Sequence, residues 1–70
     1  MKEFDVVDAR GLSCPQPVIL TKRALQAQNN KAVVIVDNDV AMDNIIRFAE
    51  SRDLKCSVEE KNDDYIITIE

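Results

Sequence analysis

The stretch Cys14-Pro15-Gln16-Pro17 marks the junction of a strand and a helix. Proline is tolerated in the first turn of a helix, where the leading N–H groups have no intrahelical partner, but it disrupts a helix interior. Two prolines at alternate positions therefore predict that a helix begins here and continues over residues 18–28. The preceding residues 4–9 read as a strand, and Gly11, the single glycine of the chain, permits the turn between the two elements.

This position has a chemical consequence for Cys14. A residue at or just before a helix start lies close to free N–H groups and to the positive end of the helix dipole, an environment that favours thiolate over thiol. Pro15 and Pro17 have no N–H to donate, so the amides of Gln16 and Val18 are the local donors for a sulfur anion. The alternative is that Cys14 is only a small apolar residue in a tight turn, since free cysteines are often buried and inert.

The remaining elements follow from periodicity and turn signals. Residues 32–36 form a β-branched run typical of a central strand, residues 40–51 an amphipathic helix, and residues 54–60 and 65–69 two strands joined by a turn at 62–64. A right-handed crossover makes the first two strands parallel, and the last two pair antiparallel. The order βαβαββ predicts an α+β two-layer sandwich, in which two helices cover one face of a mixed four-stranded sheet.

Each helix has one apolar face at 100° per residue. The first helix is predicted to bury Val18, Leu20, Thr21, Ala24, Leu25 and Ala27. The second is predicted to bury Ala41, Met42, Ile45, Ile46, Phe48 and Ala49, with an N-cap from residues 37–39. The first strand is apolar on both sides, so the pattern does not decide which side meets the helices.

Composition limits the classes of function. Residues 1–70 are predicted to form one domain, and the net charge of −4 disfavours nucleic-acid binding. With no histidine and two cysteines, the chain lacks the usual ligands of a zinc site and a Cys–His dyad, so we expect no metal. Cys56 lies inside a predicted strand and is interpreted as a core residue. No leader precedes Phe4 and the apolar runs are too short for a membrane, so we expect a cytoplasmic protein.

The sequence Asp8-Ala9-Arg10-Gly11-Leu12-Ser13-Cys14-Pro15-Gln16-Pro17-Val18, followed by Lys22 and Leu25, resembles the signature of the TusA/SirA-like sulfur-carrier family. The resemblance extends over nearly the whole chain, and in appearance it is closest to the N-terminal module of YedF-type proteins. It implies that Cys14 of the Cys-Pro-x-Pro motif carries a persulfide between proteins. Bacterial carriers usually have glutamate where this chain has Gln16, which makes the site less acidic.

The resemblance also implies the partners: a cysteine desulfurase as sulfur donor and a sulfur-relay protein as acceptor. Pyridoxal phosphate belongs to the donor, so we expect this chain to hold no cofactor. We also expect the carrier to be a monomer. Selenium is an alternative cargo, because it is chemically reasonable for the same site. Ile19, Lys22 and Arg23 are candidates for partner docking, although an isolated exposed isoleucine is common. A protein-binding or regulatory module with a structural Cys14 is the alternative function. A thiol oxidoreductase is disfavoured because Pro17 stands where the second cysteine of Cys-x-x-Cys would be.

Overall fold

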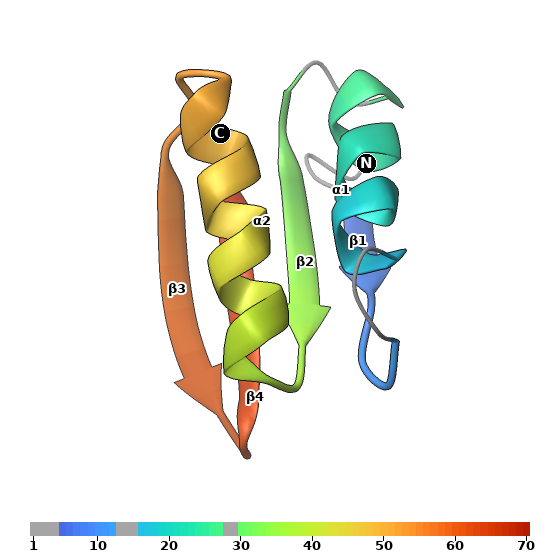
Figure 1. The fold of residues 1–70 in the computed structure, drawn as a ribbon, viewed down its shortest axis with the longest axis vertical. Coiled ribbons are helices and arrows are strands. Elements are labelled where there is room, and N and C mark those ends of the chain that lie inside the picture. Colours follow the sequence, from blue (N-terminus) through green and yellow to red (C-terminus); the bar gives the residue numbers. More distant parts are fainter. Residues whose placement is uncertain (1–4, 13–15, 28–29) are drawn as a thin grey trace.

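The chain folds into a sheet covered on one face by two helices (Figure 1). The computed structural model describes residues 5–12, 16–27 and 30–70. The elements are, in chain order, β1 (Asp5–Asp8), α1 (Gln16–Ala27), β2 (Ala32–Val36), α2 (Asp39–Ser51), β3 (Cys56–Lys61) and β4 (Asp64–Ile69). The strand order is β1-β2-β4-β3, with β1 parallel to β2 and the other pairs antiparallel. The predicted βαβαββ fold with its mixed sheet is confirmed.

The hydrophobic core fills the space between the helices and the sheet. Its centre is formed by alternate residues of the two central strands together with one face of each helix: Ala24, Leu25, Ala32, Val34, Val36, Ala41, Ile45, Ala49, Ile67 and Ile69. On β1, Val7 and the following Ala9 belong to this core, whereas Val6 is 60% exposed. The packing therefore decides the orientation of β1, which the sequence pattern left open.

Helix α1 begins two residues earlier than predicted, at Gln16, because both Gln16 and Pro17 are compatible with a first helical turn. Its buried side chains are Pro17, Thr21, Ala24 and Leu25. The Thr21 hydroxyl donates to the Pro17 carbonyl at 2.8 Å, which satisfies this buried polar group within the helix. The prediction for Ala27 was wrong: Ala27 is exposed, because it lies in the last turn of α1.

Both ends of α2 are closed by specific hydrogen bonds. Asn38 is the N-cap, and its side-chain oxygen accepts from the Ala41 N–H at 2.8 Å. At the other end Asp53 has a left-handed φ of 61°, and the Leu54 N–H donates to the Ala49 carbonyl at 3.0 Å. Because Leu54 closes the helix in this way, β3 begins at Cys56 and not at residue 54 as predicted.

The hairpin between β3 and β4 turns through Asn62 and Asp63, whose φ values of 53° and 68° suit a two-residue loop. This turn places Asp64 at the start of β4. Since β4 runs antiparallel to β2, with Tyr65 opposite Val36, the start of β4 lies beside the end of β2. The ends of the two parallel strands and the start of β4 therefore meet at one edge of the sheet.

Candidate functional site

The chain leaves β1 along a path fixed by hydrogen bonds to the neighbouring strand. The Ala9 N–H donates to the Ile35 carbonyl at 2.8 Å and so extends the parallel ladder beyond β1. The Gly11 N–H then donates to Asp37 Oδ2 at 3.0 Å. Gly11 has a φ of +78°, and a non-glycine residue at such an angle costs about 1–2 kcal/mol. Gly11 is thus the residue at which the backbone turns away from the sheet, as predicted.

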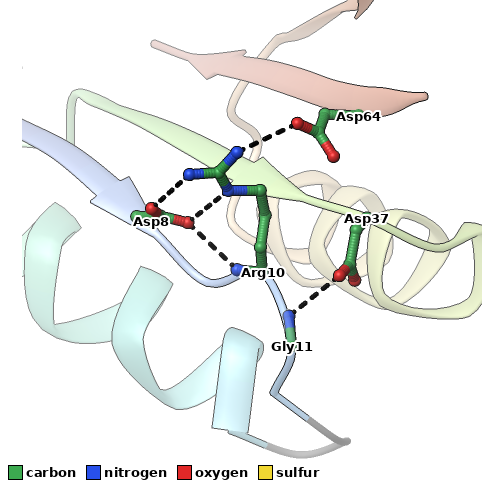
Figure 2. A network of polar contacts seen from close by, with 5 residues as sticks. All are labelled: Asp8, Arg10, Gly11, Asp37 and Asp64. Atoms are coloured by element: carbon green, nitrogen blue, oxygen red, sulfur yellow. Dashed lines mark hydrogen bonds and ion pairs between the residues drawn. The ribbon is translucent and has the colours of Figure 1, made fainter. Parts of the chain in front are cut away.

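Arg10 links this turn to two strands (Figure 2). Its Nε and Nη2 each donate to an Asp8 carboxylate oxygen at 2.8 Å, and its Nη1 donates to Asp64 Oδ2 at 3.1 Å. The Arg10 side-chain bonds, supported by the Arg10 N–H, lower the pKa of Asp8 to about 2. The two carboxylates also raise the pKa of Arg10. The Arg10 charge is therefore engaged by carboxylates, so we do not assign it to the stabilisation of a thiolate.

A further polar contact lies at the same edge of the sheet. The Tyr65 hydroxyl of β4 donates to the Asp39 carboxylate, which joins β4 to the first turn of α2. This hydrogen bond raises the pKa of Tyr65 to about 12. Side chains therefore link β1, β4 and α2 at this edge of the sheet.

The first turn of α1 is the other boundary of the site. Gln16 is exposed, Pro17 is buried and Val18 is half-buried. The first turn contains no acidic residue, so no carboxylate side chain of this turn opposes the positive end of the helix dipole. Because Pro17 has no N–H, the free donors of the turn include the amides of Gln16 and Val18. These donors suit an anion at the helix start.

Cys14 and Pro15, the two other residues of the motif, lie outside the described residues. Their neighbours in the described part are Leu12, which packs against the core, and Gln16, the first residue of α1. Cys14 is thus two positions before the helix in the sequence. The structure fixes where the chain leaves the sheet and where it enters the helix, on either side of the motif cysteine.

Cys56 has a different environment. It is half-buried at the start of β3, packs against the core and forms no disulfide. Burial raises the pKa of the Cys56 thiol, and the Glu50 carboxylate adds to this effect. Both influences favour the thiol over the reactive thiolate. Cys56 was interpreted as a core residue, and the structure places it at the margin of the core, half-buried and packed against it.

The predicted docking residues share the exposed face of α1. Ile19 is 40% exposed, and Lys22 and Arg23 are exposed on the side away from the core. Within the part of the chain that the structure describes, neither cation forms an ion pair.

Sequence reasoning missed the acidic residues that hold the turn: Asp8, Asp37 and Asp64. A signal for Asp37 was present, because it directly follows a strand predicted to lie parallel to the strand before the motif. Asp64 had no comparable signal, because its approach to Arg10 depends on the strand order.

Asp8→Asn is expected to make the protein less stable in neutral solution. The folded state holds the pKa of Asp8 at about 2, below its ordinary 3.8, so the carboxylate form is favoured by folding. This contribution is present above about pH 4 and is lost as the pH falls towards 2. Urea unfolding across this range should show a smaller acid-induced loss for Asp8→Asn than for the parent. Asp43→Asn, on the exposed side of α2, is the control, and equal pH dependence of the parent and Asp8→Asn would contradict the role of this pair.

No helix in the described ranges is long and apolar enough to cross a bilayer.

Comparison with known proteins identifies what the chain resembles. The family model described as "Sulfurtransferase TusA" matches residues 5–70. The crystal structure of a SirA-like protein from Desulfitobacterium hafniense is similar, with 34% sequence identity, a TM-score of 0.88, and coverage of 94% of this chain and 95% of the other. No curated protein matches the sequence.

Proposed function

The chain belongs to the TusA family of sulfur-transfer proteins, and from this premise we propose that it carries a sulfur atom as a persulfide on Cys14. The observation that carries the proposal is the start of α1. The helix begins two positions after Cys14, and its first turn offers free amides with no acidic residue. Such a setting favours a thiolate and would also stabilise the negative terminal sulfur of a persulfide.

The transfer consists of two sulfur exchanges. The Cys14 thiolate attacks the terminal sulfur of a donor persulfide, the donor's S–S bond breaks, and the donor cysteine leaves as a thiolate. Cys14 then bears the persulfide anion. An acceptor thiolate attacks that terminal sulfur, takes it, and releases Cys14 as the thiolate. No external oxidant or reductant is needed, because the oxidation state of the transferred sulfur is kept in each exchange.

The partners follow from this chemistry. A cysteine desulfurase would supply the donor persulfide with its own pyridoxal phosphate, and a sulfur-relay protein would accept the sulfur. The same site suits selenium as an alternative cargo. A carrier with a free thiolate works best in a reducing compartment, so we place it in the cytoplasm. Incubation with a cysteine desulfurase, pyridoxal phosphate and cysteine tests the proposal: the protein should gain sulfur, and a reductant should remove it.

The exposed face of α1 is the proposed docking surface. The helix contains two cations, Lys22 and Arg23, and no acidic residue, although the whole chain has a net charge of −4. Ile19 adds an exposed apolar side chain to this face. We therefore expect the donor to present an acidic surface near its persulfide.

Charge reversal of both residues, Lys22→Glu with Arg23→Glu, is expected to slow sulfur loading by about tenfold at low salt. Exposed charges act mainly on the rate of encounter, and added salt should reduce the difference from the parent. The measurement is the initial rate of persulfide formation at two salt concentrations. Arg47→Glu on α2 with Lys55→Glu, which lies between α2 and β3, is the matched control, because both side chains are exposed and lie outside α1. Equal loading of parent and α1 variant at low salt would place the docking surface elsewhere.

A further inference from the structure

Asp37 directly follows β2 and holds the backbone that leads to the motif cysteine. In a parallel pair, alternate N–H groups of one strand bond to carbonyls of the other. The Ala9 N–H follows this pattern with the Ile35 carbonyl, but the next N–H in the series, that of Gly11, bonds to the Asp37 side chain. The carboxylate therefore acts as the last partner of the ladder where the two chains diverge. Figure 2 shows Asp37 reaching from the end of β2 to Gly11.

The Asp37 carboxylate is itself oriented. Its Oδ1 accepts from Asn38 Nδ2 at 3.2 Å, while its Oδ2 accepts from the Gly11 N–H. Asn38 is held in turn, because its Oδ1 caps α2 through the Ala41 N–H at 2.8 Å. A continuous chain of hydrogen bonds thus runs from the start of α2 to the turn at Gly11.

The other end of the motif is fixed by packing. Pro17 is buried in the first turn of α1, and its carbonyl accepts from the buried Thr21 hydroxyl. Between Gly11 and Pro17 lie five residues, 12–16, of which Gln16 is already helical. Gly11 and Pro17 are each three positions from Cys14 in the sequence, and both are held by contacts within the described part of the chain.

We propose that Asp37 is a positioning residue for Cys14: by holding the Gly11 N–H, its carboxylate fixes the backbone that leads into the motif cysteine. This inference rests on the proposed function in taking Cys14 as the sulfur-bearing residue. The contact between reacting sulfurs is sensitive to displacement, because a shift of about 1 Å can cost as much as a hundredfold in rate. A helix start favours a thiolate only when the sulfur lies close to it.

Two substitutions separate the hydrogen bond from the charge. Asp37→Asn removes the charge and keeps an oxygen that can accept from Gly11, whereas Asp37→Ala removes both. Two readouts are measured for each variant. The first is the rate of Cys14 alkylation by iodoacetamide across pH, followed by peptide mapping, which needs no sulfur donor. The second is the initial rate of persulfide loading by a cysteine desulfurase.

Compared with Asp37→Asn, Asp37→Ala should alkylate Cys14 with a pH midpoint shifted upward, and should load sulfur about fivefold more slowly. Asp39→Ala is the matched control, since it removes a carboxylate and a hydrogen bond at the same edge without touching Gly11. Its readouts should stay close to those of the parent. If Asp37→Ala does not fold, Asn38→Ser carries the test, because serine keeps a helix cap but lacks the side-chain amide N–H that Asn38 donates to Asp37. That variant should also alkylate with a raised midpoint.

Identical alkylation profiles for Asp37→Ala and Asp37→Asn would overturn the positioning role, as would a parent-like profile for Asn38→Ser if that variant carries the test. An equal change in Asp39→Ala would do the same, because it would show a general effect of this edge. Failure of the parent to load sulfur, combined with the expected alkylation shift, would instead refute the proposed function and leave the role of Asp37 intact.

Discussion

Ile45→Ala is expected to lower the free energy of unfolding by about 2–5 kcal/mol. The Ile45 side chain is fully buried in the middle of α2, between the helix and the sheet. Its truncation removes apolar contacts and leaves a cavity that the surrounding structure fills only in part. A domain of this size has a total stability near the lower end of about 5–15 kcal/mol. The variant should therefore be close to unfolding at room temperature.

Urea unfolding followed by circular dichroism measures this loss. Val40→Ala is the matched control, because Val40 lies on the same helix and is 64% exposed. Its effect should stay within about 0.5 kcal/mol of the parent. If Ile45→Ala unfolded at the same urea concentration as Val40→Ala, the assignment of the buried face of α2 would be wrong.

The local elements were predictable because the signals lie close together in the sequence. The apolar period of α2 identified Ala41, Ile45 and Ala49, which are all buried. Periodicity alone could not grade the burial within that face. Phe48 was predicted to be core, but it is half-buried, with the Arg52 guanidinium 5.0 Å from the centre of its ring. Whether a flank of the face is covered depends on the neighbouring elements, which the helix sequence does not contain.

The polar contacts around the motif were not predictable from the sequence. Arg10 and Asp64 are far apart in the chain, and they meet because β1 and β4 both flank β2. Pairing rules gave the β1–β2 and β3–β4 neighbours but not the placement of β4 beside β2. The turn at Gly11 could be predicted, since it depends on one residue type. The Gly11 N–H donates to Asp37, and which residue accepts this hydrogen bond depends on the register between β1 and β2.

Cys14→Ser is expected to abolish sulfur loading completely, while the variant remains folded. Serine is close to cysteine in size, but its hydroxyl cannot form a persulfide. Cys56, the other cysteine, cannot take over this role, because burial and the Glu50 carboxylate raise its pKa and so favour the unreactive thiol. Cys56→Ser is the matched control, and it should load sulfur at about the parent's rate. A folded Cys14→Ser that still accepted sulfur would contradict the assignment of the carrier residue.

Intact-mass spectrometry after incubation with a cysteine desulfurase, pyridoxal phosphate and cysteine tests the central claim most directly. The parent and Cys56→Ser should each gain the mass of one sulfur atom, a reductant should remove it, and Cys14→Ser should show no gain. An adduct on Cys14→Ser that is absent from Cys56→Ser would move the chemistry to Cys56. A parent that gains no sulfur from a desulfurase shown to be active on another carrier would contradict sulfur carriage and favour a binding module with a structural Cys14.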